Sequence, residues 1–288
     1  MSAPFSRRAA LKTLGGGALL ASVAPAQSAN ASAPLQLRGN INHSVCKWCY
    51  PNQSLEELAQ AAKEIGLSSI ELLGPDEWPV VQKHGLTCAL VMSGASIPNG
   101  FNEPANHDAL IENYTDLIPK AANAGLTSVI CFSGNRNGMD DEVGLQNCVV
   151  GLQKLMPLAE QHGITMIMEL LNSKVDHADY MCDRTHWGVE LAKQVGSERF
   201  KLLYDIYHMQ IMEGDVIRTI RDNHEYIGHY HTGGNPGRNE IDETQELNYP
   251  AIMRAIVETG YTGFVGQEFI PRRTPLVSLR EAVALCDV

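Results

Sequence analysis

The sequence predicts an α/β fold, a single-domain (β/α)8 TIM barrel over residues 32–288. The first observation is a recurring unit made of an amphipathic helix, a glycine and a short apolar strand. Glycine just past a helix is a common C-terminal stop because it enters the left-handed conformation without steric cost. The second observation is that strand and helix alternate eight times over about 250 residues, which is typical of this barrel. A doubly wound open sheet is the main alternative, but no GxGxxG motif follows the first predicted strand.

Eight predicted strands carry this pattern, each short and mostly apolar. In chain order they cover residues 37–44, 69–73, 87–92, 128–132, 164–169, 200–205, 228–231 and 264–268.

The predicted helices between these strands show apolar residues at 3.6-residue spacing. They include residues 54–65, 215–227, 249–259 and 276–286. The clearest apolar face predicts one continuous helix from Leu145 to Ala159.

Residues 1–31 have the features of an export signal. Arg7 and Arg8 precede a short apolar run over residues 13–23, and small residues offer cleavage after Ala26 or Ala31. This arrangement predicts a twin-arginine signal peptide and a periplasmic or otherwise exported protein. A disordered tail with two chance arginines is the alternative. The apolar run is too short for a permanent anchor, so we expect no membrane anchor after signal removal.

The formal net charge is -11 at pH 7. Removal of the predicted signal leaves 19 basic and 33 acidic residues, a net charge of -14. Such an acidic surface repels phosphate backbones, so the sequence argues against nucleic acid as a partner.

The seven cysteines are odd in number and irregularly spaced, which does not fit a disulfide framework. Cys46 and Cys49 have the CxxC spacing of redox and zinc sites, but no second CxxC exists, and we do not expect the motif to open a helix as it does in a thioredoxin-like fold. We expect two half-buried thiols, with a redox centre as the alternative.

Polar residues end four consecutive predicted strands, where an apolar core residue would otherwise be expected. They are Glu169, Asp205, His231 and Glu268. The carboxyl ends of barrel strands meet at one mouth, so these side chains should converge. Holding even one uncompensated buried charge costs several kcal/mol. The sequence therefore predicts a divalent metal, and the oxygen-rich set favours Mn, Mg or Co over Zn. Taken singly, each acid has an alternative as a solvated or capping group, and the histidine as a structural residue.

Four further polar residues follow the same strands: Asn172, Lys174, His208 and Arg238. Arg238 belongs to a Gly-rich loop that could close over a ligand. We predict that these side chains bind the hydroxyl and carbonyl groups of a substrate. The alternative is a local role in loops and helix caps.

Several motifs resemble those of the xylose-isomerase-like barrel superfamily, and most closely its hydroxypyruvate isomerase group. The resemblance spans essentially the whole mature chain. The matching motifs are Glu169-Leu170-Leu171-Asn172, Tyr204 to Gln210, Pro236 to Glu240 followed by Leu247-Asn248-Tyr249, and Gly266-Gln267-Glu268.

The resemblance implies a metal-dependent aldose-ketose type isomerase that acts on a small α-hydroxycarbonyl compound, a sugar or keto acid, by enediolate proton transfer. It implies that Glu169 and Glu268 move the proton, and that His208 and Arg238 orient the substrate. Hydroxypyruvate isomerases usually carry Gln where this chain has His231, and His is more typical of ketose 3-epimerases. A ketose 3-epimerase or a lyase acting on a keto-sugar therefore stays open, with a non-catalytic sugar binder as a weaker alternative. A homo-oligomer is compatible with this group.

Overall fold

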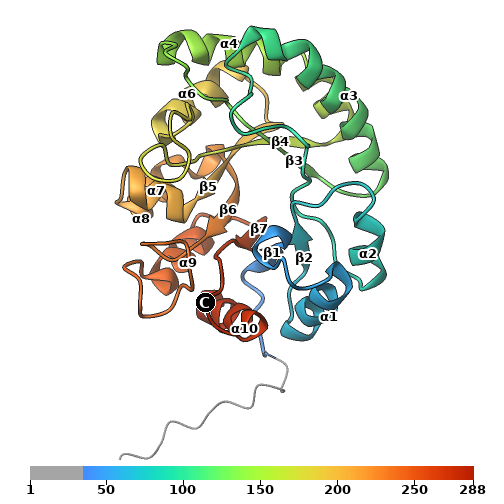
Figure 1. The fold of residues 1–288 in the computed structure, drawn as a ribbon, viewed down its shortest axis with the longest axis vertical. Coiled ribbons are helices and arrows are strands. Elements are labelled where there is room, and N and C mark those ends of the chain that lie inside the picture. The colour runs from blue at the N-terminus through green and yellow to red at the C-terminus, as the bar shows by residue number, and fades with distance from the viewer. Residues whose placement is uncertain (1–34) are drawn as a thin grey trace, which may run out of the picture. The chain divides into compact units, whose positions relative to one another are not determined.

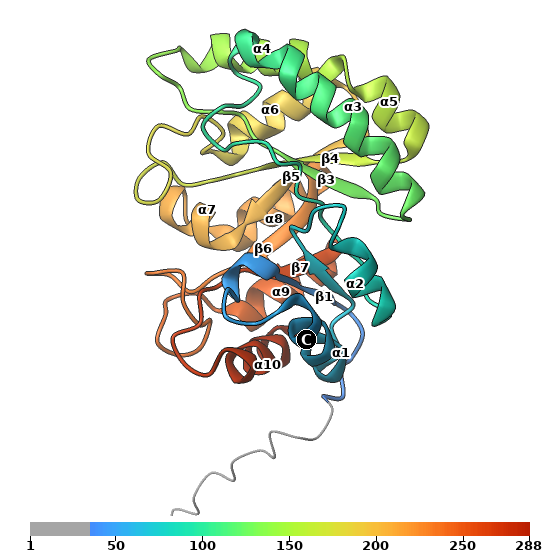
Figure 2. The same cartoon turned by 45° about the vertical axis from the view of Figure 1, so that its right-hand side comes forward.

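Parallel strands form the centre of the fold and helices surround them in both views (Figures 1 and 2). The computed structural model describes residues 35–288, so the predicted signal peptide lies outside the described residues. The sheet has the order β2-β1-β7-β6-β5-β4-β3. Its strands are β1 Asn42–Cys46, β2 Ser69–Glu71, β3 Ser128–Cys131, β4 Thr165–Glu169, β5 Phe200–Asp205, β6 Ile227–Thr232 and β7 Phe264–Gln267.

The predicted third strand, residues 87–92, takes the place between β2 and β3 without forming a regular strand. Val91 pairs with Leu73 on one side and with Val129 on the other through isolated parallel bridges. The Ala89 N–H instead bonds the Ser69 hydroxyl at 2.8 Å, which interrupts the backbone ladder. Residues 87–92 thus connect the two ends of the seven-stranded sheet, and the predicted barrel is confirmed with an irregular eighth position.

Ten α-helices occur in residues 35–288. They are α1 Leu55–Ile65, α2 Trp78–Lys83, α3 His107–Asn123, α4 Asp141–Gln153, α5 Met156–His162, α6 Thr185–Val195, α7 Ile206–Met212, α8 Val216–Asn223, α9 Tyr249–Glu258 and α10 Pro275–Cys286. Short 3-10 helices are η1 Lys47–Cys49, η2 Pro104–Asn106 and η3 His224–Tyr226. None of the helices in this part of the chain is both long and apolar enough to cross a bilayer.

Helix α1 illustrates how the local sequence sets the ends of an element. Ser54 and Glu57 form a capping box at its start, in which each side chain accepts a hydrogen bond from the other residue's backbone N–H. The helix stops at Gly66, whose φ of 106° lies in the left-handed region that glycine adopts freely. This is the helix-glycine-strand unit that the sequence predicted.

Three predicted boundaries were wrong. The continuous helix over residues 145–159 is divided into α4 and α5, because Pro157 has no N–H to continue the helical hydrogen bonds. The first strand begins at Asn42 instead of residue 37, since a bend with Gly39 at φ 81° interrupts the extended backbone. The helix predicted over residues 215–227 ends at Asn223, and η3 follows it.

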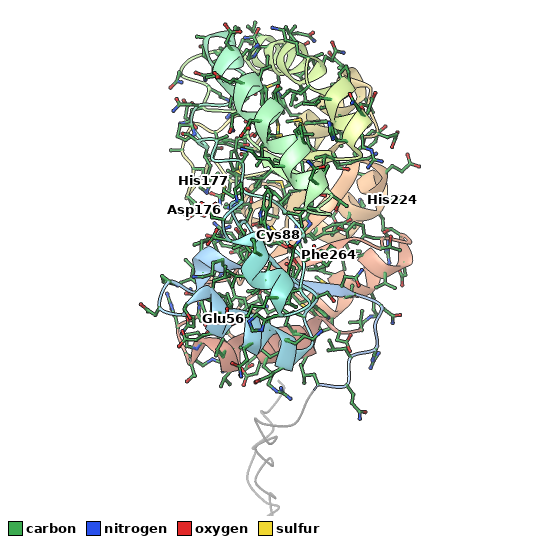
Figure 3. All side chains as sticks on the ribbon, turned by 90° about the vertical axis from the view of Figure 1, so that its right-hand side faces the viewer. Glu56, Cys88, Asp176, His177, His224 and Phe264 are labelled. Carbon is green, nitrogen blue, oxygen red and sulfur yellow. The ribbon has the colours of Figure 1, made fainter. Side chains whose placement is uncertain are left out.

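The carboxyl ends of the strands lie on one face of the barrel, as parallel order requires. In Figure 3, Asp176 and His177, which follow β4, lie on the opposite side from His224, which precedes β6. We call the face at the carboxyl ends the mouth. Its strand ends position the candidate site.

Candidate functional site

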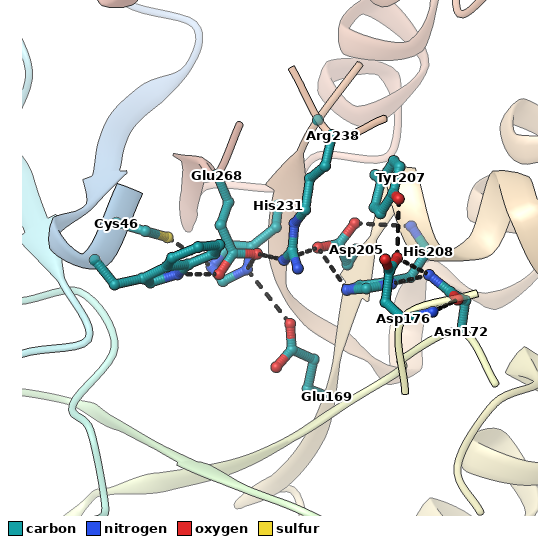
Figure 4. Close-up of polar contacts among 12 residues, drawn as sticks. Cys46, Glu169, Asn172, Asp176, Asp205, Tyr207, His208, His231, Arg238 and Glu268 are labelled. Atoms are coloured by element: carbon teal, nitrogen blue, oxygen red, sulfur yellow. Dashed lines mark hydrogen bonds and ion pairs between the residues drawn. The ribbon is translucent and has the colours of Figure 1, made fainter. Parts of the chain in front are cut away.

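Glu169, Asp205, His231 and Glu268 come together at the mouth. Glu169 and Asp205 are the last residues of β4 and β5, His231 is the penultimate residue of β6, and Glu268 directly follows β7. One nitrogen or carboxylate oxygen from each of the four lies within 4.8 Å of the others, and all four residues are buried. We call this group the four-residue site (Figure 4).

The imidazole of His231 lies at the centre of these contacts. Its Nδ1 is 2.8 Å from Glu268 Oε2 and 3.7 Å from Glu169 Oε1. Its Nε2 faces the opposite way and lies 2.6 Å from Oε1 of Glu71. Nδ1 therefore faces the carboxylates of the site, and Nε2 contacts Glu71 on the opposite side of the ring.

The environment separates the pKa values of the three acids. Burial raises the pKa of Asp205 to about 8, although the Arg238 guanidinium opposes this shift. Burial also raises the pKa of Glu169. Burial would raise the pKa of Glu268 too, but Arg238 and His231 hold it well below its ordinary value. The positive groups of the protein therefore do not offset the burial of Glu169 and Asp205.

The donor set fits a divalent cation. Among the described residues, Glu169 Oε1 and His231 Nδ1 are buried atoms without a hydrogen-bond partner, although Nδ1 lies 2.8 Å from Glu268 Oε2. Unpaired buried polar atoms are uncommon, and two of them that face the same cluster of carboxylates indicate a missing partner. Three carboxylates and one imidazole are ligands that suit Mn, Mg or Co, and Zn would accept the same types.

Arg238 follows β6 and extends over the site. Its Nη2 lies 2.6 Å from Glu268 Oε2 and 3.4 Å from Asp205 Oδ2. The guanidinium also lies over the rings of Trp48 and Tyr207, at 5.1 Å and 5.5 Å from their centroids. A residue so held cannot swing freely, so Arg238 presents a fixed positive charge at the mouth.

Trp48 is a site residue that the sequence analysis missed. It lies in η1, immediately after β1, and its Nε1 donates a hydrogen bond to Glu268 Oε1 at 2.7 Å. The side chain is 43 % exposed, so one part of the indole faces solvent. Its position just past a strand end is the signal that identified the three acids and the histidine, but the predicted first strand ended at residue 44, whereas β1 continues to Cys46.

His208 lies in the first turn of α7 with its ring buried. Nδ1 accepts a hydrogen bond from the Asn172 amide at 2.6 Å, so Nε2 carries the proton of the neutral ring. That Nε2 lies 3.8 Å from Asp205 Oδ2. Burial keeps the pKa of His208 well below its ordinary value. The ring is therefore a neutral donor next to the four-residue site.

Asn172 and Lys174 make local contacts. Asn172 donates to Asp176 Oδ2 as well as to His208, and its Oδ1 accepts the Val175 and Asp176 N–H groups. It supports the loop after β4 and the ring of His208.

The Lys174 ammonium donates to the Ile211 and Met212 carbonyls at 2.8 Å and 3.1 Å, at the C-terminal end of α7. Such a contact satisfies carbonyl groups that the helix leaves unpaired. For Asn172 and Lys174, the structure therefore favours the loop-and-cap alternative over the predicted contact with substrate.

All seven cysteines are free and buried. Cys46 and Cys49 are fully buried instead of half-buried, and the CxxC motif forms the 3-10 turn η1, which the sequence analysis did not expect. The Sγ of Cys46 lies 3.6 Å from His231 Nε2 and 3.7 Å from Glu71 Oε1. Burial raises the pKa of both thiols well above its ordinary value, so they stay protonated and uncharged.

Comparison with known proteins gives one family. The family model described as xylose isomerase-like TIM barrel matches residues 50–286. The hydroxypyruvate isomerase of Escherichia coli is 30% identical over 178 residues, which cover 62% of this chain and 68% of the relative. The 2-oxo-tetronate isomerase of Pectobacterium atrosepticum is 27% identical over 225 residues, covering 74% and 85%.

Among solved structures, a family 2 AP endonuclease from Brucella melitensis superposes with a TM-score of 0.74 at 23% identity. The match covers 83% of this chain and 97% of that one. At this identity the likeness establishes the shared barrel and nothing about activity.

Proposed function

Because the chain belongs to the xylose isomerase-like TIM barrel family, we propose that it is a divalent-metal-dependent isomerase of a small α-hydroxycarbonyl compound. The relatives named hydroxypyruvate isomerase and 2-oxo-tetronate isomerase support a small keto acid as the substrate class. One observation carries the proposal: Glu169, Asp205, His231 and Glu268 offer donor atoms within 4.8 Å of one another in a buried mouth.

The proposed reaction moves a proton between neighbouring carbons next to a carbonyl. Glu169, Asp205, His231 and Glu268 would hold the metal. When bound, the cation would supply Lewis-acid stabilisation of the negative charge that develops on the substrate oxygens. General acid/base transfer contributes about 10²- to 10⁴-fold, so positioning and charge stabilisation must provide the remaining acceleration.

The chain's own residues divide the remaining work. Glu169 and Glu268 are the pair that would remove and return the proton. Glu169 Oε1 has no hydrogen-bond partner among the described residues, so it is free to accept a proton. Glu268 is held by Trp48 and Arg238, which fixes the direction of its carboxylate. His208 Nε2 has a proton to donate to a substrate oxygen, and Arg238 would orient the substrate.

A ketose 3-epimerase is the second candidate, and a lyase acting on a keto-sugar shares the same first step. His231 favours the epimerase, because His is typical of that group at this position and Gln of hydroxypyruvate isomerases. Both reactions need two groups able to exchange a proton with substrate carbon, and Glu169 and Glu268 provide them.

Incubation in heavy water separates these activities. The metal-loaded protein would be mixed with hydroxypyruvate, 2-oxo-tetronate and a panel of ketohexoses, and followed by NMR. An isomerase gives deuterium on carbon together with a shifted carbonyl. An epimerase gives deuterium at a carbon of inverted configuration beside an unchanged carbonyl, and a lyase gives a new alkene or a fragment. A folded, metal-loaded protein that labels none of these compounds would refute the proposed isomerase for this substrate class.

A further inference from the structure

Glu71 forms a buried bridge behind the four-residue site. Its Oε1 lies 2.6 Å from His231 Nε2 and 2.8 Å from His229 Nε2. All three side chains are almost completely inaccessible to solvent. Glu71 ends β2 and the two histidines belong to β6, and β1 and β7 lie between these strands in the sheet. The carboxylate therefore spans the barrel interior to reach them.

Gly266 in β7 leaves the space for this bridge. A Cβ at that position would lie 2.6 Å from Glu71 Oε1 and 2.9 Å from His231 Cδ2. Contacts this short do not occur for real side chains, so any larger residue would push the two groups apart. The bridge thus depends on the absence of a side chain at Gly266 in β7.

The bridge decides which nitrogen of His231 carries a proton. A carboxylate oxygen only accepts, so both Nε2 atoms that contact Glu71 Oε1 must donate. Because Nε2 is fixed as a donor, Nδ1 is the nitrogen of His231 that can offer a lone pair to a cation, and it faces Glu169 and Glu268.

We propose that Glu71 is a positioning residue, which fixes the ring of His231 so that Nδ1 is presented to a cation in the four-residue site. The inference rests on the proposed metal-dependent function. A histidine that binds a metal usually donates its other ring N–H to a carboxylate or carbonyl, which sets its orientation and increases its basicity. The Glu71–His231 contact has this geometry, and Glu71 itself does not reach the mouth through any hydrogen bond to Glu169, Asp205 or Glu268.

The alternative is that Glu71 only satisfies two buried histidines and stabilises the fold. The two roles differ in a measurable way. A stabilising role predicts a lower melting temperature with normal metal affinity in Glu71 variants. A positioning role predicts weaker metal binding by protein that is still folded.

The test measures Mn²⁺ binding to metal-free protein from the electron paramagnetic resonance signal of the free ion. Glu71→Gln keeps the size of the side chain and removes its charge. We expect its Mn²⁺ affinity to fall by about 10- to 100-fold, the usual effect of losing such a partner. Gly266→Ala should reproduce the loss, because it displaces the same contact without changing either partner.

Glu213→Gln is the matched control. Glu213 also accepts two hydrogen bonds, from the Thr185 N–H at 2.9 Å and hydroxyl at 2.7 Å, but it takes no part in the four-residue site. Its Mn²⁺ affinity should stay within a few-fold of that of the unmodified protein. Melting temperatures of all metal-free proteins, measured in parallel, show which variants are folded.

Unmodified protein that binds Mn²⁺, together with a folded Glu71→Gln variant of equal affinity, would overturn the positioning role and leave the metal site intact. If Glu71→Gln does not fold, Gly266→Ala is judged by the same criterion. Unmodified protein that binds neither Mn²⁺, Mg²⁺ nor Co²⁺ would overturn the proposed function as well as this inference.

Discussion

The Nε1 of Trp48 donates a hydrogen bond of 2.7 Å to Oε1 of Glu268, a residue 220 positions away in the chain. The contact joins the turn after the first strand to the end of the last one, across the point where the sheet connects β1 with β7. The hydrogen bond from Trp48 fixes Oε1 of Glu268, and Arg238 Nη2 donates to the other oxygen, Oε2. Two donors from separate loops, one neutral and one cationic, therefore orient the carboxylate of a proposed proton-transfer group.

Trp48→Phe should reduce kcat while keeping the aromatic surface. A hydrogen bond to a charged group contributes about 1.5–3 kcal/mol, which corresponds to roughly 10- to 100-fold in rate if the contact is needed in the transition state. Steady-state kinetics on the active substrate measures the change. Trp187→Phe is the control, because Trp187 donates to the Asp141 carbonyl on the outside of the barrel and should affect stability only. Equal kinetics for Trp48→Phe and the unmodified protein would contradict the orienting role.

Glu268→Gln should abolish turnover and largely preserve the fold. The amide is similar in size to the carboxylate but cannot accept a proton from carbon, so we expect a loss of at least about 10²-fold. Circular dichroism and a thermal melt would verify folding, and the solvent-deuterium assay would measure exchange. Glu112→Gln, an exposed change on α3, should behave as the unmodified protein does. Retained exchange would remove Glu268 from the proton-transfer role.

Chelation should silence the protein, and Mn, Mg or Co should restore it. Three carboxylates that converge in a buried site repel one another, so loss of the cation should also lower the melting temperature. Metal at 100 times its Kd stabilises a folded protein by about 2.7 kcal/mol. EDTA saturated beforehand with the same metal that the protein holds controls for effects of the chelator itself. Full activity with less than stoichiometric metal, measured by elemental analysis, would refute metal dependence.

We propose that residues 1–31 direct export by the twin-arginine route and take no part in catalysis. Deletion of residues 1–31 should leave activity and melting temperature unchanged, since the predicted barrel begins at residue 32. Replacement of Arg7 and Arg8 by Lys in the full chain should stop export without changing activity in extracts. Cell fractionation by immunoblot checks localisation. A truncated protein that fails to fold would show instead that the segment is structural.

The predictable part of this protein is the part that depends on local pattern. Helix-glycine-strand units gave the barrel, and acids at strand ends gave Glu169, Asp205 and Glu268 because parallel strands bring their ends together. Glu71 was missed since the predicted strand ran to residue 73, which placed it mid-strand, whereas β2 ends at Glu71. Its partner His231 lies 160 positions away. Contacts across a barrel interior depend on side-chain direction and on space such as that left by Gly266, and neither is a property of local sequence.

The loop that carries Arg238 offers a separate test of stability. Glu240 Oε1 accepts hydrogen bonds of 2.9 Å from the Arg272 N–H, the Arg273 N–H and the Ser278 hydroxyl, which ties this loop to the start of α10. Glu240 is 6% exposed. Burial would raise its pKa, but these hydrogen bonds hold the pKa below its ordinary value of 4.5. Glu240→Gln should destabilise the protein by about 1–2 kcal/mol at pH 7, because charge-assisted hydrogen bonds become neutral ones.

The pH dependence of this loss identifies its cause. A carboxyl group whose pKa is lowered by folding stabilises the protein fully above its unfolded pKa, and the contribution disappears as pH falls through the folded value. The difference in unfolding free energy between unmodified protein and Glu240→Gln should therefore be constant from pH 7 to about pH 5 and shrink below pH 4.5. Urea titrations at a series of pH values measure it. Glu243→Gln, an exposed neighbour, should show little difference at any pH. A Glu240→Gln deficit that persists unchanged into acid would mean that the loop is held by the shape of the side chain and not by its charge.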